Sequence, residues 1–219
     1  MKRLNMEEKK KRVREKPEEK LIRLTQIENQ LWAQGKRIAG IDEVGRGPLA
    51  GPVVTACVSI PKDKLILGVD DSKKLSEKKR EAIFDLLRDA ADYCETCFMG
   101  PEIIDEINIL NATKRAMETC GAGFDGTFLI DAVTGLHLPG EIHPIVHGDA
   151  LSYMIGAASI IAKVTRDRYM IELDEKYPMY GFARNKGYGT AEHIAALKKY
   201  GPCPEHRRSF IGNILGDKK

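Results

Sequence analysis

Residues 38–52 read Ile-Ala-Gly-Ile-Asp-Glu-Val-Gly-Arg-Gly-Pro-Leu-Ala-Gly-Pro, a strand-like run followed by a glycine-rich turn. The run delivers two adjacent carboxylates, Asp42 and Glu43, into a turn built around Gly45, Arg46 and Gly47. Mg²⁺ and Mn²⁺ prefer carboxylate oxygens, glycines let backbone N–H groups approach an anion, and arginine offers a planar fork that matches phosphate. We therefore predict a metal site beside a phosphate cradle, and chemistry on a nucleic-acid backbone. The alternative is an ordinary solvated turn at the end of a strand.

The length of 219 residues favours one substantial core with an N-terminal extension. Residues 1–37 hold twelve Lys and Arg against six Glu, a net charge of +6, which leaves −3 for residues 38–219. Affinity for a polyanion therefore has to come from local basic clusters and from metal ions. In the extension, a helix is predicted near 18–34, and residues 2–20 are expected to fray. Its apolar stripe could dock on the body: Leu21, Leu24, Ile27, Leu31 and Trp32.

The composition carries no sign of a membrane segment or a signal peptide, so we expect a cytoplasmic protein. Five cysteines, an odd number, fit a compartment where thiols stay reduced. Cys94 and Cys97 have no second pair at zinc spacing, and positions three apart in a strand face opposite sides. Structural thiols explain these residues better than zinc ligands.

Apolar periodicity predicts that strands and helices alternate along the rest of the chain. After the strand that begins at Ile38, strands are expected at 53–60, 93–99, 127–131 and 143–147, and helices at 76–90, 101–108, 112–121, 150–173 and 191–200. This alternation predicts an α/β domain in which helices flank a mixed central sheet.

Two further acids stand where separate segments could meet the first pair. Asp131 ends the apolar run of residues 128–130, and Asp149 directly precedes a long predicted helix. Two-metal cleavage of a phosphodiester needs an open cluster of carboxylates that holds the ions about 4 Å apart. As alternatives, Asp149 could be a helix cap and Asp131 a turn acid. Because neighbouring strand residues point to opposite faces, Asp42 and Glu43 can share a cluster only if the chain bends or flattens there.

The string from Gly40 to Pro52 resembles the signature of the ribonuclease HII family, the metal-dependent endonucleases that cut RNA joined to or paired with DNA. Four later segments resemble the same family: residues 70–76, the strand ending at Asp131, residues 148–164, and residues 187–190 followed by His193. A closing stretch, 206–210, resembles it too. The likeness covers roughly residues 37–212. It implies the ribonuclease H-like fold.

The resemblance implies that Asp42, Glu43, Asp131 and Asp149 are metal-binding catalytic acids, with Mn²⁺ or Mg²⁺ as cofactor. It implies cleavage of RNA in RNA–DNA hybrids and nicking at ribonucleotides embedded in duplex DNA, which leaves a 3′-hydroxyl and a 5′-phosphate. It also implies that the turn at 45–47 grips the ribonucleotide and that Tyr188 packs against the next sugar. The further substrate contacts that it implies are Ser72, Lys73, Lys74, Arg207 and Ser209. By contrast, Asp167, His143 and His193 have simpler explanations as structural or surface residues.

Two positions depart from the family pattern, since His147 stands where Lys is usual and Ala132 where Gly is common. The closest enzymatic rival is ribonuclease HIII, whose members carry a folded N-terminal domain, and the 37 residues before Ile38 are few for such a domain. A noncatalytic hybrid-binding protein is the other rival, but it predicts lost acids, and all four are present. We expect a monomer. The sequence leaves a replication-clamp contact open.

Overall fold

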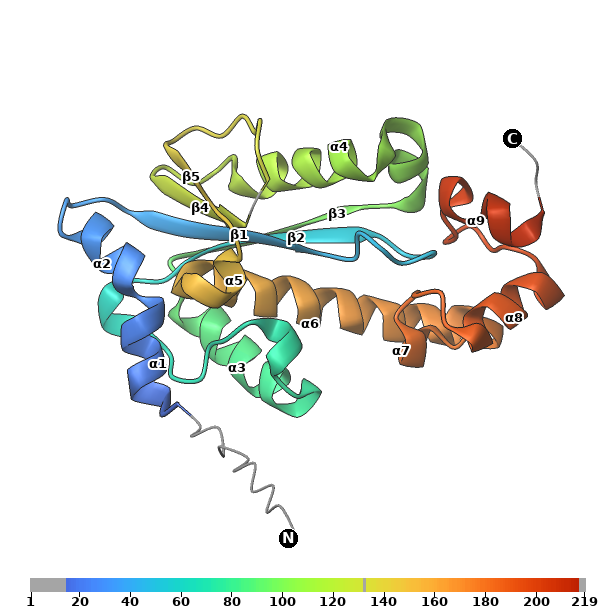
Figure 1. Cartoon of the computed structure of the whole chain (residues 1–219), viewed down its shortest axis with the longest axis horizontal. Helices are drawn as coiled ribbons and strands as arrows, with labels where there is room; N and C mark the ends of the chain where they lie inside the picture. The colour runs from blue at the N-terminus through green and yellow to red at the C-terminus, as the bar shows by residue number, and fades with distance from the viewer. Residues whose placement is uncertain (1–14, 132, 217–219) are drawn as a thin grey trace, which may run out of the picture.

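A computed structural model describes residues 15–131 and 133–216, and it is built on one five-stranded mixed sheet (Figure 1). The strand order is β3-β2-β1-β4-β5. The strands are β1 (Ile38–Val44), β2 (Val53–Ser59), β3 (Tyr93–Met99), β4 (Thr127–Asp131) and β5 (Ile142–Ile145). β1 pairs antiparallel with β2 and parallel with β4, as the expected mixed sheet requires. The prediction that residues 2–20 fray lies mostly outside the described residues.

Helices cover both faces of the sheet, which gives three layers (Figure 1). One face packs against α6 (Tyr153–Lys176), beside which lies α3 (Glu77–Ala90), and the other face packs against α4 (Pro101–Gly121). The remaining helices are α1 (Pro17–Leu24), α2 (Gln26–Trp32), α5 (Gly148–Leu151), α7 (Phe182–Asn185), α8 (Ala191–Tyr200) and α9 (Arg208–Leu215). Three short 3₁₀ turns complete the described elements: Lys62–Lys64, Ser72–Lys74 and Pro178–Tyr180.

The long helix α6 runs directly along β1 because β1 carries a glycine at the crossing point. A Cβ atom at Gly40 would lie 2.1 Å from the backbone of Met154, so no larger residue fits there. Further along, Arg166 of α6 lies against Gly45, where a Cβ atom would approach its Nε to 2.3 Å. The end of β1 is therefore held close to the middle of α6.

The N-terminal helices dock on the α6 side of the sheet, as their apolar stripe predicts. Leu24 and Leu31 are buried in the main core, and Leu21, Ile27 and Trp32 pack against it in part. The expected single helix is interrupted, because Thr25 leaves helical geometry and its hydroxyl bonds back to the Leu21 carbonyl at 2.8 Å. From residue 15 onward the extension therefore forms two short helices that contribute to the core of the following domain.

Several boundaries differ from the predicted ones for local reasons. The two helices predicted at 101–108 and 112–121 form one element with a kink, because Asn108 has a φ of 63°. The helix predicted at 150–173 is divided at Ser152, which is extended and caps α6 with its hydroxyl. β5 starts one residue earlier and ends two residues earlier than predicted. The short helices α7 and α9 were not predicted.

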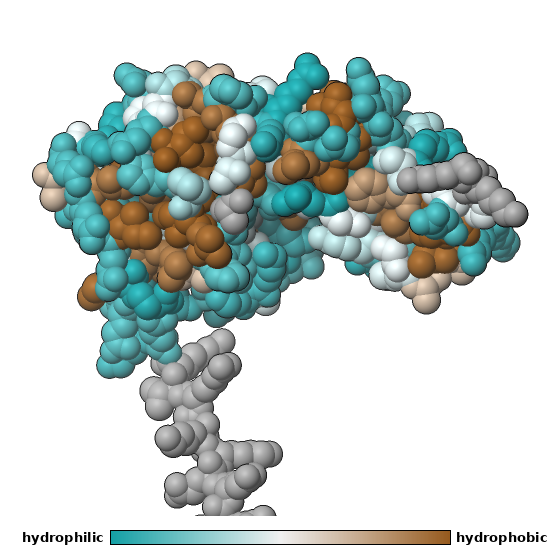
Figure 2. Space-filling model, turned by 45° about the horizontal axis from the view of Figure 1, so that its top comes forward, coloured by the Kyte–Doolittle hydropathy of each residue, from teal (hydrophilic) through white to brown (hydrophobic). Residues whose placement is uncertain are grey.

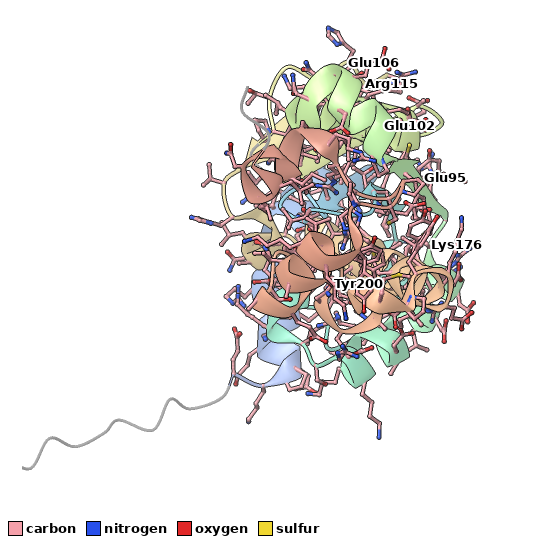
Figure 3. All side chains as sticks on the ribbon, turned by 90° about the vertical axis from the view of Figure 1, so that its right-hand side faces the viewer. Glu95, Glu102, Glu106, Arg115, Lys176 and Tyr200 are labelled. Atoms are coloured by element: carbon pink, nitrogen blue, oxygen red, sulfur yellow. The ribbon has the colours of Figure 1, made fainter. Side chains whose placement is uncertain are left out.

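The C-terminal helices extend beyond the end of the sheet (Figure 1). Figure 3 shows this end, with Lys176 at the end of α6 and Tyr200 at the end of α8, whereas Glu102 and Arg115 mark α4. On the face in Figure 2, apolar patches are interrupted by hydrophilic side chains. Among residues 15–131 and 133–216, no helix is long and apolar enough to cross a membrane.

Candidate active site

Asp131 is the last residue of β4, and Asp42 lies two residues before the end of the adjacent parallel strand β1. The register pairs Ile41 with Ile130, and each aspartate is the next residue on its own strand. Ile41 and Ile130 both face the α4 side of the core, so the pleat turns both aspartates toward the α6 side. The two carboxylates, 89 positions apart in sequence, therefore share one face and one edge of the sheet.

The Asp42 side chain is buried between the sheet and α6. Only 7% of the residue is exposed. Burial raises its pKa well above the usual range, the charge of Glu43 raises it further, and a hydrogen bond with Ser159 lowers it. Ser159 lies on α6 and is also 2.9 Å from the Ser72 hydroxyl. The charged form of Asp42 is therefore unfavourable in this site, and a bound cation would stabilise it.

Glu43 follows on the same strand, in a regular antiparallel ladder with β2. The register runs through Asp42 and Glu43 without a bulge. Its carboxylate accepts a hydrogen bond from Arg46 at 3.4 Å, across the turn. Burial raises the pKa of Glu43, Arg46 lowers it, and Asp131 raises it. The Glu43 side chain thus interacts electrostatically with the other acids, although it leaves the strand on the face opposite to Asp42.

Asp149 reaches the same group from the start of α5. The neighbouring Gly148 donates its backbone N–H to Asp131 at 3.0 Å, which ties the two segments together. The Asp149 carboxylate lies 3.5 Å from the ammonium of Lys73. Burial raises its pKa, followed by the charge of Asp71, whereas Lys73 lowers it. Asp149 does not cap α6, because Ser152 has that role.

Asp131 is the centre of this acidic group, because its charge raises the pKa of each of the other three acids. Oxygen donors that repel one another in a partly buried site suit a hard divalent cation. Within the described part of the chain, however, no three His, Cys, Asp or Glu side chains are arranged to enclose an ion. The carboxylates of Glu43 and Asp149 are instead paired with Arg46 and Lys73, so a cation has to displace these partners.

The turn after β1 is supported from inside by two fully buried arginines. Arg166 donates to the carbonyls of Pro52, Lys186 and Ala50 at 2.8 to 3.1 Å. Arg207 donates to the carbonyls of Gly45, Arg46 and Gly51 at 2.6 to 3.0 Å. Gly45 has a φ of 92°, which favours glycine. The backbone of the turn is therefore fixed, and Arg46 and Gly47 are exposed.

Tyr188 lies beside this turn, as a substrate-binding role requires. A Cβ atom at Gly47 would be 3.8 Å from the Tyr188 ring, and the tyrosine is 44% exposed. The backbone of Leu49 donates to the Gly187 carbonyl at 2.8 Å, which joins the two loops. An exposed aromatic ring and an exposed glycine turn thus form one surface.

Three predicted substrate contacts have bonding partners within the chain. Arg207 faces backbone carbonyls instead of solvent, because it lies beneath the turn. Ser72 is buried against Ser159. Ser209 is exposed, but its hydroxyl donates to Asp105 at 2.5 Å. Lys73 and Lys74 remain exposed, near Asp149 and Asp71 respectively.

Three further residues were singled out in the sequence near the site: His147, Ala132 and Asp167. His147 is exposed in a left-handed conformation with a φ of 58° before α5. Ala132 lies outside the described residues. Asp167 is an ion-paired structural acid, as expected, with Lys163 at 2.5 Å and Arg80 at 3.7 Å.

Sequence reasoning missed Ser159 and Arg166, which prove to be central to the site. Both lie on α6, seven residues apart, and therefore on one face of the helix. Ser159 stands among small apolar residues that predict a buried face. A polar residue and an arginine on such a face were the available signal for a buried polar contact.

Comparison with known proteins agrees with this fold. The family model described as Ribonuclease HII matches residues 39–212. A Ribonuclease HII from Acetivibrio thermocellus is 51% identical over 212 residues, which covers 95% of this chain and 83% of that protein. One from Bacillus mycoides is 51% identical over 208 residues, 92% of this chain and 80% of that protein.

Solved structures show the same architecture. The ribonuclease H2 of Pyrococcus horikoshii superposes with a TM-score of 0.69 at 28% identity, over 82% of this chain and 97% of that one. The RNase HII of Archaeoglobus fulgidus, solved in a complex with PCNA, superposes with a TM-score of 0.66 at 27% identity. The match covers 78% of this chain and 94% of that one. Bst-RNase HIII, solved with Mn²⁺, superposes with a TM-score of 0.65 at 16% identity, over 83% of this chain and 68% of that one. This likeness shows the fold alone.

A mixed sheet with carboxylates at its edge beside a glycine turn, on a ribonuclease H-like scaffold, defines a metal-dependent nuclease. The chain belongs to the ribonuclease HII family, and it is an endoribonuclease that hydrolyses phosphodiester bonds.

Proposed function

We propose that this chain cleaves the RNA strand of RNA–DNA hybrids and also nicks duplex DNA at single embedded ribonucleotides, leaving a 3′-hydroxyl and a 5′-phosphate. The observation that carries this proposal is the juxtaposition of Asp42 and Asp131 at one sheet edge, directly before the exposed glycine turn. Asp42 lies on the strand that leads into the turn, and Asp131 lies on the strand paired with it, so a phosphodiester held by the turn lies next to the acids.

Asp42, Glu43, Asp131 and Asp149 are the residues that would hold Mg²⁺ or Mn²⁺. The chemistry such cations supply is activation of the attacking water and stabilisation of the departing oxygen. The carboxylates of Glu43 and Asp149 would then release Arg46 and Lys73. The freed cationic side chains are placed to bind phosphates of the cleaved strand.

Recognition of the ribose is assigned to the turn and to Tyr188. A 2′-hydroxyl both donates and accepts hydrogen bonds, so backbone groups at Gly45, Arg46 and Gly47 can sense it. The exposed Gly47 lets the sugar approach closely. The Tyr188 ring, next to Gly47, would pack against the sugar of the following nucleotide, which favours a ribonucleotide followed by a deoxyribonucleotide.

The deciding experiment uses a DNA duplex with one ribonucleotide, with Mg²⁺ and Mn²⁺ in separate reactions. We expect a single nick at the ribonucleotide, and we expect Asp42→Asn to abolish it while binding is retained. Binding of hybrid without cutting in both metals would instead favour a noncatalytic hybrid-binding protein.

We further propose that the chain is a cytoplasmic monomer and that a replication clamp is its protein partner. The clamp proposal is supported by the Archaeoglobus relative, which was solved in complex with PCNA. Light scattering after size-exclusion chromatography tests the monomer, and cell fractionation tests the compartment. Surface plasmon resonance with a purified sliding clamp tests the partner; no binding at micromolar clamp would reject it.

A further inference from the structure

Two buried histidines form a continuous hydrogen-bonded chain that ends at Tyr188. His193 Nδ1 lies 2.9 Å from the Tyr188 carbonyl oxygen, and His193 Nε2 lies 3.0 Å from His206 Nε2. The backbone N–H of Cys203 donates to His206 Nδ1 at 3.1 Å. His193 is fully buried and His206 is 1% exposed. The chain links α8 and the segment before α9 to the loop that presents Tyr188.

The end groups of this chain determine where its protons lie. A carbonyl oxygen can only accept, so His193 Nδ1 carries the hydrogen. A backbone N–H can only donate, so His206 Nδ1 is bare. His206 therefore carries its hydrogen on Nε2 and donates it to the bare Nε2 of His193. Every bond in the chain is satisfied when both rings are neutral.

The surroundings keep both rings neutral and in place. Burial lowers the pKa of His193, and burial followed by the charge of His193 lowers the pKa of His206 to about 4. The rings of Tyr180 and Phe182 pack against His206, with centroids 4.7 and 5.7 Å away. His206 also forms an isolated β-bridge with Ala50, three residues beyond Gly47.

We infer that His193 and His206 are positioning residues for ribonucleotide recognition, because they fix the backbone of Tyr188 beside the glycine turn. This inference rests on the proposed function. The segment that carries His206 is joined to the turn by the backbone bonds that flank it, from the Arg207 N–H to the Leu49 carbonyl at 2.9 Å and from the Gly51 N–H to the Glu205 carbonyl at 2.8 Å. The His206 ring connects this segment to His193, which holds the Tyr188 side through the carbonyl. The distance between the Tyr188 ring and Gly47 is thereby set from beneath by groups that do not touch substrate.

The test compares cleavage of a single-ribonucleotide duplex with cleavage of a long RNA–DNA hybrid, as a ratio of kcat/KM values. His193→Ala removes the bond to the Tyr188 carbonyl and is expected to lower this ratio about two- to tenfold, the range that loss of one buried hydrogen bond gives. His193→Asn keeps a donor near the Nδ1 position and is expected to restore at least part of the ratio.

Leu173→Ala is the matched control, because Leu173 is buried in the apolar cluster that contains Tyr180 and Phe182, the rings that pack against His206, but takes no part in the hydrogen-bonded chain. It is expected to lower thermal stability with no change in the ratio. Equal ratios for His193→Ala and the wild type, with Tyr188→Ala still changing the ratio, would overturn the inference. A wild type that cuts neither substrate would reject the proposed function instead.

A measurement on the unmodified chain covers the case in which the variants do not fold. Long-range ¹H–¹⁵N spectra at pH 7 distinguish the two neutral tautomers and the imidazolium. The expected result is Nδ1–H for His193 and Nε2–H for His206. An imidazolium at either position, or Nδ1–H at His206, would overturn the inference.

Discussion

The carboxylate of Glu28 accepts a hydrogen bond from the Ser152 hydroxyl at 2.6 Å, although the two residues are 124 positions apart. The same oxygen accepts the backbone N–H of Met154 at 3.1 Å, so a residue of the N-terminal extension caps α6. Nearby, Arg23 donates to the carbonyl of Ala150 at 3.0 Å, next to Asp149. The extension thus braces the segment that carries one of the four acids.

Glu28→Ala is expected to destabilise the fold by about 3 kcal/mol, because it leaves a buried hydroxyl and a buried N–H without their acceptor. Glu28→Gln keeps an acceptor oxygen and should cost less than half as much. Urea denaturation measures both. Glu18→Gln, at an exposed position of α1, is the control and should be neutral. Equal losses of stability for Glu28→Ala and Glu28→Gln would show that the acceptor oxygen of Glu28 does not stabilise the contact between the extension and α6.

Asp42→Asn and Asp131→Asn are each expected to lower kcat on the order of 1,000-fold, equivalent to about 4 kcal/mol of lost transition-state stabilisation. Because Asp42 is buried beside Glu43, its neutral replacement relieves repulsion. The Asp42→Asn protein should therefore melt at the same or a higher temperature than the wild type without metal.

Thermal shift with Mn²⁺ separates ligation from folding in these variants. Mn²⁺ should raise the melting temperature of the wild type, since a ligand that binds only the folded state stabilises it. It should have little effect on Asp42→Asn. A full Mn²⁺ shift in that variant would remove Asp42 from the ligand set.

Arg207→Gln is expected to destabilise the fold by about 3 kcal/mol, because several buried carbonyls of the turn lose their donor. KM should rise with an unchanged salt dependence, since Arg207 faces carbonyls and no phosphate. Arg46→Gln is the matched control at an exposed arginine: it should be near neutral for stability and should reduce the slope of log affinity against log salt by about 0.9. The opposite pattern would restore Arg207 as a phosphate ligand.

Tyr188→Ala is expected to weaken cleavage at a single-ribonucleotide junction by about tenfold while long hybrids are cut almost as before, because only the junction depends on the packed sugar. Tyr188→Phe keeps the ring and should retain most junction activity. Steady-state kinetics on both substrates measures this. Equal losses on the two substrates would contradict a junction role.

The stability of the fold should fall in mild acid because of His206. Its pKa is about 4 in the folded chain and 6.5 in the unfolded chain, so below pH 6.5 the unfolded state binds more protons. Stability is therefore full above pH 6.5 and is lost toward pH 4, by about 3 kcal/mol in total. His206→Gln should flatten the curve in this window, as measured by denaturation at each pH. Parallel curves for the two proteins would reject the assignment.

Much of the fold was predictable because its signals are local. The β1 run, the acids that follow it and the positive-φ glycine of the turn are encoded within a few residues, and apolar periodicity placed most strands and helices. The break at Ser152 and the helix α9 were missed, because each depends on contacts distant in sequence. Ser152 bonds to Glu28, and Ser209 in α9 bonds to Asp105.

By itself the sequence determined which chemical groups are present: adjacent carboxylates near the end of a buried strand, further acids at strand and helix ends, and a glycine-rich turn that carries an arginine. Only the tertiary structure decided which charged groups face the solvent. By sequence Arg46 and Arg207 are equally suited to bind phosphate, but Arg207 is turned inward, where the carbonyls of residues 45, 46 and 51 accept its hydrogen bonds. The parallel register of β1 and β4 likewise brings Asp42 and Asp131 together, since strand pairing depends on the packing of both sheet faces and not on local pattern.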